Sequence, residues 1–357
     1  MIDKPIRVIE LFAGYGSQAL ALKYAGIPYE NHFVCEFDKY AIQSYNDIHN
    51  TKFGTTDIRY IHAKDLNITE TDKYKYLLTY SFPCTDLSVA GRRAGMSRNS
   101  GTRSSLLWEV ERLLSECEEL PQYLLMENVP QVADNSNIQL FGEWIDFLAS
   151  IGYDSYYKVL NAKDFGVPQN RERCFMVSIL KSEHKDFIFP TGRPLTKRLK
   201  DLLEEEQFVD EKCFCTTKNA MQLIDTLVTK NNLDYFKKMN MITPKVFDVI
   251  CVGFVEKGTG KHQSNSVYST NGVSPTLATQ QDTWILVDTN KGTSYGIRKL
   301  TPKECFRLMG VRDEDYCKVT VSNRQKKKQA GNSIVVDVMM DIFTNLFVKE
   351  CKNNVLF

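Results

Sequence analysis

The stretch Arg7-Val-Ile-Glu-Leu-Phe-Ala-Gly-Tyr-Gly-Ser-Gln-Ala-Leu20 decides the fold class. Its first half, up to Phe12, is a mostly apolar run that predicts a short buried strand. Gly14 and Gly16 then allow a sharp turn, and apolar residues recur at helical spacing up to Gly26. Because a strand, a glycine turn and a helix make the first unit of an open α/β sheet, we expect a doubly wound, Rossmann-like sheet.

The glycine turn predicts a site for a cofactor with an adenosine group. A helix that begins after such a turn presents free N–H groups and the positive end of its dipole. A second predicted strand, 32–37, carries Glu36, whose carboxylate can accept hydrogen bonds from a ribose diol. The pattern Gly14-x-Gly16-x-x-Ala19 also satisfies the fingerprint of NAD-binding proteins. The residues alone therefore leave two alternatives open, an ordinary tight βα turn and the turn of a nicotinamide-dependent oxidoreductase.

The dipeptide Pro83-Cys84 ends another apolar run, 76–82, which predicts a buried strand. Proline cannot continue a strand ladder, so Cys84 is expected in a loop at the carboxyl end of that strand. Ligands of open α/β sheets bind at this end. A thiol there is a candidate nucleophile, although most free cysteines are small core residues.

A carboxylate and two guanidinium groups also fall at predicted strand ends. Glu127 closes the apolar run 123–126, and Arg171 and Arg173 precede the predicted strand 174–179. Their equal parity places the two arginines on one face of an extended chain. Beside a carboxylate they would keep it ionised or offer donors to a substrate oxygen, whereas a surface ion-pair patch is the alternative.

The composition is that of an ordinary globular protein, with 43% hydrophobic and 25% charged residues among 357. A net charge of +1 means that any nucleic-acid contact must use a local basic patch. We find no signal peptide and no long apolar run, so we expect no membrane association and reduced cysteines in a cytoplasm. None of the ten cysteines forms a Cys-x-x-Cys pair, and we expect no metal site.

The pattern of elements predicts three parts. The segment 91–105 is rich in Gly, Ser and Arg and reads as a loop beside Cys84 that suits a phosphate backbone, although a solvated loop is the default. Alternation of strands and helices stops near residue 185 and returns near Ile297. We expect a catalytic, cofactor-binding domain at 1–180, a smaller, mostly β or irregular domain at 181–296, and a C-terminal segment at 297–357 that returns to the catalytic domain.

In this order the motifs resemble those of the DNA (cytosine-5)-methyltransferases of prokaryotic or phage, restriction-modification type. The resemblance covers nearly the whole chain apart from its variable middle. The motifs that carry it are Phe12-x-Gly14-x-Gly16, Pro83-Cys84, Glu127-Asn128-Val129, Gln169-x-Arg171-x-Arg173, Arg298 with the segment 300–310, and Gly331-Asn332-Ser333.

The resemblance implies S-adenosylmethionine, not NAD, as the cofactor. It would lie against Phe12 with Glu36 on its ribose, and Asp57 looks like the family's adenine contact, with Asp65 as a rival. The other cofactor contacts that the resemblance implies are Gly14, Gly16, Pro83, Asn332 and Ser333.

The resemblance also implies methyl transfer to carbon 5 of a flipped-out cytosine in a specific duplex DNA sequence, through a covalent adduct with Cys84. Glu127 would hydrogen-bond ring nitrogen 3, and Arg173, with Arg171, would hold the exocyclic oxygen. The smaller domain corresponds to the family's target-recognition domain. Thr85 departs from the family pattern, which usually has Gln after the catalytic cysteine. The residues implied to contact DNA are Ser88, Arg92, Arg93, Arg98 and Arg298.

Two relatives of this function remain open, a tRNA cytosine-5 methyltransferase of the same family and a catalytically silent DNA-binding protein. The long insert between Arg173 and Arg298 favours the reading of duplex DNA. We expect a monomer that acts on double-stranded DNA in the cytoplasm of a bacterial or phage-infected cell. A cognate restriction endonuclease would be a functional companion and not a physical partner.

Overall fold

The structure is a computed structural model that describes residues 4–83, 97–98, 102–229, 248–256, 262–279, 281–289 and 294–348. Cys84, Thr85, Ser88, Arg92 and Arg93 therefore lie outside the described residues. The chain divides into two compact units. The first unit comprises Met1–Leu160, Glu172–Thr191 and Val338–Phe357, and the second comprises Asn161–Arg171 and Gly192–Asp337.

This division differs from the expected one at both junctions. The first unit continues to Thr191 instead of ending at residue 180, and the chain returns to it at Val338 instead of residue 297. The short segment Asn161–Arg171 belongs to the second unit although the chain on both sides of it belongs to the first.

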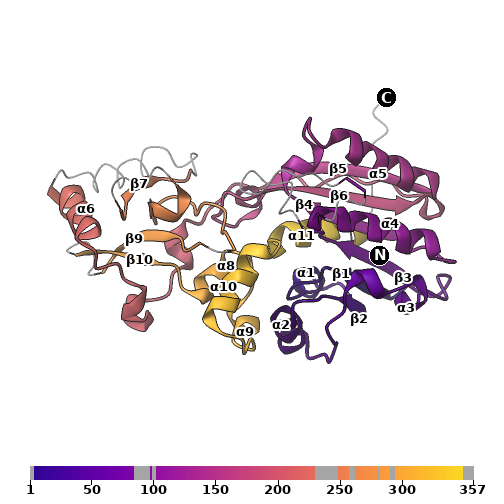
Figure 1. Ribbon diagram of the computed structural model, residues 1–357, viewed down its shortest axis with the longest axis horizontal. Helices are drawn as coiled ribbons and strands as arrows, with labels where there is room; N and C mark the ends of the chain where they lie inside the picture. The colour runs from indigo at the N-terminus through magenta and orange to yellow at the C-terminus, as the bar shows by residue number, and fades with distance from the viewer. Residues whose placement is uncertain are drawn as a thin grey trace. The chain divides into compact units, whose positions relative to one another are not determined.

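The first unit is built on a six-stranded sheet in the order β2-β1-β3-β4-β6-β5 (Figure 1). The pairs β1–β2, β1–β3 and β3–β4 are parallel, and β6 runs antiparallel to β4. The chain leaves β1 toward β2 on one side and later returns to β3 on the other, so the topological switch point lies at β1, where doubly wound sheets bind ligands. The strands are β1 (Ile6–Leu11), β2 (Tyr29–Cys35), β3 (Lys75–Tyr80), β4 (Tyr123–Asn128), β5 (Tyr153–Asn161) and β6 (Glu172–Leu180).

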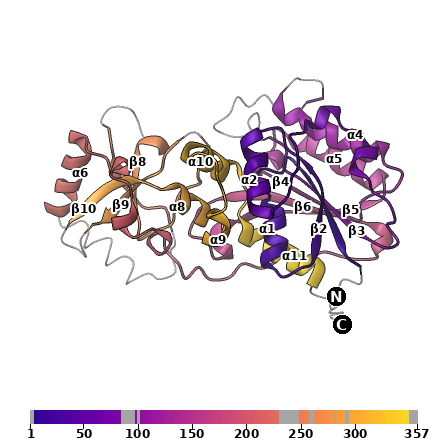
Figure 2. The same ribbon diagram turned by 90° about the horizontal axis from the view of Figure 1, so that it is seen from below.

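Helices cover both faces of this sheet, as the two views show (Figures 1 and 2). On one face α4 and α5 pack against alternate strand residues, and on the other α1 lies over β1 while Phe347 stacks edge-on against Tyr123 of β4. The expected doubly wound α/β fold is thereby confirmed. The helices of this unit are α1 (Ser17–Tyr24), α2 (Lys39–His49), α3 (Ala63–Leu66), α4 (Leu107–Glu116), α5 (Ile138–Ser150) and most of α11 (Val336–Phe343), which a π-helical turn (Thr344–Val348) extends.

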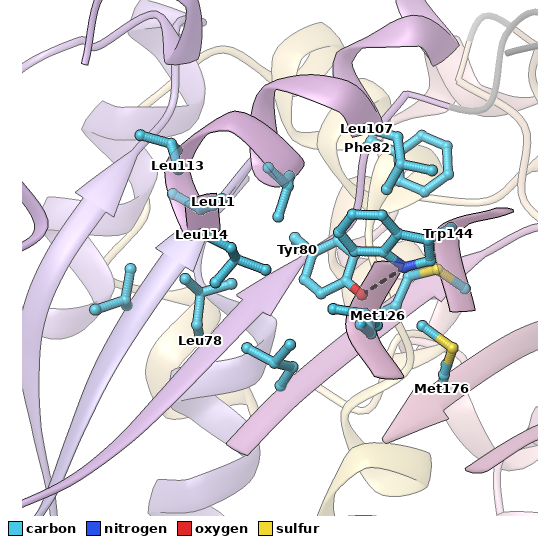
Figure 3. Packing of buried hydrophobic residues seen from close by; sticks show 14 of the residues in the cluster. Leu11, Leu78, Tyr80, Phe82, Leu107, Leu113, Leu114, Met126, Trp144 and Met176 are labelled. Atoms are coloured by element: carbon cyan, nitrogen blue, oxygen red, sulfur yellow. Dashed lines mark hydrogen bonds between the residues drawn. The ribbon is translucent and has the colours of Figure 1, made fainter. Parts of the chain in front are cut away.

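The core beneath α4 and α5 fixes the strand that leads to the proposed nucleophile. Tyr80, the last residue of β3, is fully buried and accepts a 3.1 Å hydrogen bond from the indole Nε1 of Trp144 (Figure 3). Leu78, Leu107 and Met126 pack around them in the same cluster. Because the Tyr80 hydroxyl is buried, hydrogen-bonded and packed among these side chains, the end of β3 has a fixed position in the sheet.

The second unit has a smaller four-stranded sheet in the order β10-β9-β8-β7. The pairs β7–β8 and β9–β10 are antiparallel and β8–β9 is parallel, and α6 packs on the sheet through Ala220 and Leu227. The elements of this unit are α6 (Lys218–Thr229), β7 (Cys251–Phe254), β8 (Ser266–Ser269), β9 (Trp284–Asp288), β10 (Tyr295–Lys299), α8 (Pro302–Arg307), α9 (Asp313–Tyr316) and α10 (Asn323–Asn332).

Across the ranges that the structure describes, no single helix is long and apolar enough to cross a membrane. One pair of helices, Asn323–Asn332 and Val336–Val348, meets the length and composition test only when both are counted across a bend of 43°.

Candidate active site

The strand register brings the predicted site residues to one edge of the first sheet. Leu11 is paired with Cys35 on one side and with Tyr80 on the other, and Tyr80 is paired with Met126. Because β1, β2, β3 and β4 are parallel, the residues that follow these four positions leave the sheet at the same edge. Those residues are Phe12, Glu36, Ser81 and Glu127, and Gly14 and Pro83 come next along the chain.

The glycine turn at residues 12–16, which we call the cofactor turn after the ligand that we expect there, has an unusual backbone from its first residue. Phe12 has a φ of 59°, a left-handed conformation that a side chain with a Cβ seldom adopts, and Gly14 and Gly16 have φ values of 59° and 81°. The Gly16 N–H donates to the Ala13 carbonyl at 2.9 Å and closes the turn at the start of α1. Backbone strain at a strand end is typical of ligand sites.

Glu36 fixes this turn to the end of β2. One carboxylate oxygen accepts the Gly14 N–H at 2.9 Å and the other accepts the Asp38 N–H at 2.8 Å. Burial raises the pKa of Glu36, and the N–H donors of Asp38 and Gly14 oppose that rise. The carboxylate is therefore held at the turn and oriented by the backbone.

These residues fit S-adenosylmethionine in two respects. A Cβ built on Gly14 would meet no other atom within 4 Å, so the turn leaves room for a ligand at that position. Glu36, an oriented carboxylate at the tip of the second strand, has the chemistry that binds a ribose diol. Phe12 adds an aromatic side chain at the start of the turn.

The two candidate adenine contacts have different surroundings. The Thr56 N–H donates to the Glu36 carbonyl at 2.8 Å, which places the neighbouring Asp57 beside the end of β2. Asp57 pairs with the guanidinium of Arg59 and also accepts the main-chain N–H of Arg59, and the hydrogen bond from the guanidinium is the chief cause that lowers the pKa of Asp57. Asp65 instead accepts the N–H of His62 and caps α3. This geometry favours Asp57 over Asp65.

Two side chains hold the backbone that leads to Cys84. The Asn128 side-chain amide donates to the Phe82 carbonyl at 3.0 Å, and the Ser104 hydroxyl donates to the Pro83 carbonyl at 2.8 Å. Asn128 also accepts the Val129 N–H at 2.8 Å. Since Asn128 follows Glu127 directly in β4, the carboxylate and the chain before Cys84 are tied to the same strand end.

Glu127 and Arg173 form an ion pair at this strand end. Glu127 is nearly buried, and its Oε1 lies 3.1 Å from the Nε of Arg173, whose side chain is 16% exposed. The antiparallel pairing of β4 with β6, which aligns Asn128 with Cys174, brings Arg173 beside this end of β4. The predicted carboxylate and one of the two predicted arginines are thus brought together.

Arg171 has a different environment from that of Arg173. It is buried within the second unit, where its guanidinium donates to the main-chain carbonyls of Leu277 (3.3 Å), Gly331 (3.0 Å) and Ser333 (2.6 Å). These bonds brace the segment that holds Asn332 and Ser333, both of which belong to this unit. Arg171 precedes β6, which begins at Glu172, so the parity that we expected to align the two arginines does not apply to it.

Of the predicted DNA contacts that the structure describes, Arg98 makes a double ion pair with Glu111 at 2.9 and 2.7 Å and lies 3.8 Å from the ring centre of Trp108. Arg298 differs from the expectation more strongly. Its side chain is fully buried, and its guanidinium is held by Glu206 and by Glu304, which is also fully buried. Arg298 thus joins β10 to the capping box of α8 and has no exposed surface to offer a phosphate in this structure.

Sequence reasoning gave no role to Asn128 or Ser104. Asn128 lies inside the motif Glu127-Asn128-Val129 and Ser104 inside the segment 91–105, but their carbonyl partners are backbone groups that a sequence pattern does not reveal. Within the part of the chain that the structure describes, no group of three or more His, Cys, Asp or Glu side chains could hold a metal ion.

Comparison with known proteins shows which family the chain resembles over nearly its whole length. The model of the family described as C-5 cytosine-specific DNA methylase matches residues 6–348. The type II methyltransferase M2.ScrFI of Lactococcus lactis subsp. cremoris is 33% identical over 397 residues, which span 97% of this chain and all of that protein. M.HhaI of Haemophilus parahaemolyticus, another type II methyltransferase, is 31% identical over 96% of this chain and 94% of its own length. Among solved structures, S. pombe Dnmt2 methyltransferase matches with a TM-score of 0.65 at 20% identity, over 96% of this chain and 98% of that one, which shows a shared fold.

Proposed function

The chain belongs to the C-5 cytosine-specific DNA methylase family and is a DNA (cytosine-5)-methyltransferase, and from that premise we propose how its residues divide the work. The substrate is a cytosine flipped out of a specific duplex DNA sequence, and Cys84 forms a covalent adduct with it. S-adenosylmethionine, which this family generally uses, supplies an electrophilic methyl group when it is bound.

The chemical problem is that carbon 5 of cytosine is a weak nucleophile. Addition of the Cys84 thiolate to ring carbon 6 makes carbon 5 electron-rich and places negative charge toward ring nitrogen 3. Glu127 takes up a proton when the base is bound and donates it to ring nitrogen 3, which offsets that charge, and Arg173 stabilises the carboxylate that is left. After the methyl group is on carbon 5, a base removes the carbon 5 proton and the bond to Cys84 breaks, which restores the aromatic ring.

One observation carries this proposal, namely the ion pair of Glu127 and Arg173 next to the tethered backbone of Phe82 and Pro83. Arg173 orients the Glu127 carboxyl and keeps a donor at the rim of the same site for the exocyclic oxygen of the base. Asn128 and Ser104 fix the chain that delivers Cys84. A nicotinamide enzyme would have no use for this arrangement.

We propose that Phe12, Gly14, Glu36, Asp57 and Pro83 hold the cofactor at the carboxyl edge of the first sheet. The strand register supports this assignment, because it brings the carboxyl ends of β1, β2, β3 and β4 to that edge together. Gly16 closes the turn behind them. The expected cofactor contacts Asn332 and Ser333 belong to the second unit, which we propose to contain the target-recognition region.

The test is methyl transfer from tritiated S-adenosylmethionine to unmethylated plasmid DNA, followed by bisulfite sequencing. We expect protected cytosines in one recurring sequence context, and no transfer by Cys84→Ser with DNA binding retained. Transfer RNA is assayed in parallel, since a tRNA methyltransferase of this family is the other reading. Turnover by Cys84→Ser would refute the nucleophile, and label in tRNA alone would refute the DNA substrate.

A further inference from the structure

The two glycines of the cofactor turn face different surroundings. A Cβ on Gly14 would meet nothing within 4 Å, whereas a Cβ on Gly16 would collide with the imidazole of His49 and lie 2.6 Å from Cε2 of Tyr45. Both clashing side chains project from α2, which follows the second strand. Gly14 therefore leaves the ligand side of the turn open, and Gly16 lets two rings of α2 approach its other side.

His49 makes a polar contact with the turn between its two glycines. Its Nε2 lies 3.1 Å from the carbonyl oxygen of Tyr15. A carbonyl can only accept, so His49 donates through Nε2, and this bond fixes the direction of the peptide that joins Tyr15 to Gly16. The His49 ring is itself held by Tyr45, whose ring centre is 4.4 Å away.

Tyr45 extends the contact to the strand before the turn. It is fully buried, and its hydroxyl donates to the carboxyl group of Glu10, a fully buried residue of β1. The other Glu10 oxygen accepts the N–H of Ala19 in the first turn of α1 at 3.4 Å. Glu10, Tyr45 and His49 thus link β1, α2, the turn and α1.

We propose that Tyr45 and His49 are positioning residues that set the cofactor turn from behind and thereby determine the affinity for the cofactor. They touch neither the cofactor nor the base, and they act through the Tyr15 carbonyl, Gly16 and Glu10. The inference rests on the proposed function, because it assumes that the turn binds the cofactor. Their loss should weaken cofactor binding and leave DNA binding unchanged.

The test is isothermal titration of the full chain with S-adenosylhomocysteine, the reaction product, as the probe. His49→Leu keeps volume but removes the donor, and we expect its dissociation constant to rise about tenfold, the effect of one hydrogen bond. His49→Gln restores an N–H donor and should return the affinity toward that of the parent chain. Tyr45→Phe removes only the hydroxyl and should weaken binding by about the same factor as His49→Leu.

The matched control is Tyr157→Phe, a half-exposed tyrosine of edge strand β5, which should bind the probe as the parent does. In the methylation assay, His49→Leu should raise KM for S-adenosylmethionine with kcat nearly kept, and its dissociation constant for DNA should not change. Equal probe affinity in folded His49→Leu and Tyr45→Phe overturns the inference, as does an equal loss in His49→Leu and His49→Gln. A parent chain that fails to bind the probe at all refutes the proposed function instead.

Discussion

The side-chain amide of Asn128 donates to the carbonyl of Phe82 at 3.0 Å, so the strand that carries Glu127 also holds the backbone two residues before Cys84. The proposed acid group and the chain that leads to the proposed nucleophile consequently share one anchor.

The Asn128 anchor can be tested with an isosteric change. Asn128→Asp keeps the oxygen that accepts the Val129 N–H but loses the donor to the Phe82 carbonyl. A small displacement of a reacting group is costly, so we expect the single-turnover methylation rate to fall by about 10- to 100-fold. S-adenosylhomocysteine affinity, measured on the same protein, should stay within about twofold. An unchanged single-turnover rate would contradict the anchoring role.

The Glu127–Arg173 pair can be tested by a double-mutant cycle. Glu127→Gln and Arg173→Met should each lower the single-turnover rate by on the order of 100-fold, the scale of a positioned acid or donor. Because both act on one group, the double variant should be little slower than the slower single variant, with a coupling energy of about 1–3 kcal/mol. Fully additive losses would show that the two side chains act separately.

Arg171 should behave as a structural residue in spite of its place in the same motif. Arg171→Met removes three hydrogen bonds to the carbonyls of Leu277, Gly331 and Ser333. Hydrogen bonds from a charged group are worth about 1.5–3 kcal/mol each, so urea unfolding should show a loss of about 3 kcal/mol or more. The matched variant Arg173→Met should lose far less stability. The reverse order would contradict the structural role of Arg171.

The comparison of these two arginines shows where sequence reasoning ended. Residues of equal parity share a face only while the chain is an extended strand. The strand β6 begins at Glu172, so Arg173 lies inside it and Arg171 lies before it. The segment Asn161–Arg171 folds with residues more than a hundred positions later, a long-range packing that local pattern does not contain. Arg173, which lies inside the strand, forms an ion pair with the predicted carboxylate, Glu127.

The fold itself was largely predictable. The strand, turn and helix at 6–24, the apolar strands before Pro83 and Glu127, and the carboxylate at Glu36 all have local signatures. The insertion of antiparallel β6 between β4 and β5 and the late return at Val338 have none. Tyr45 and His49 were missed because their helix reads as an ordinary amphipathic one, and their partners, a glycine and a main-chain carbonyl, become visible only in three dimensions.

Arg298 should support the second unit and not bind DNA. Arg298→Met leaves the fully buried Glu304 without its partner, which should cost about 3–5 kcal/mol of unfolding free energy. The double variant with Glu304→Met should recover part of that loss. At a temperature where Arg298→Met is folded, the slope of log affinity for DNA against log salt should be unchanged. A slope lowered by about one, the value for a lost phosphate contact, would contradict this assignment.

Glu10 should make stability depend on pH. Burial raises the pKa of Glu10 from 4.5 to about 7, against the opposing hydrogen bonds from Tyr45 and Ala19. In the unfolded chain the carboxyl ionises near its ordinary pKa, while the folded chain keeps it protonated up to about 7, so folding is opposed increasingly as pH rises between these values. The unfolding free energy of Glu10→Gln minus that of the parent should therefore grow from pH 4.5 to pH 7.5, by on the order of 3 kcal/mol. The measurement is urea unfolding of both proteins across this pH range. A difference that stays constant would contradict the assignment.

The strand order also constrains how the enzyme is made. During synthesis β4 is made first, then β5, then β6, yet β6 lies between the other two in the sheet. A growing chain therefore presents Glu127 on an open sheet edge before the strand that carries Arg173 has emerged, and β5 must leave the place beside β4 free for it. Pairings of this kind form slowly and late. The Glu127–Arg173 ion pair can therefore form only after residue 173 has been made, so a nascent chain stopped before residue 172 would carry Cys84 and Glu127 without the arginine that orients the carboxylate.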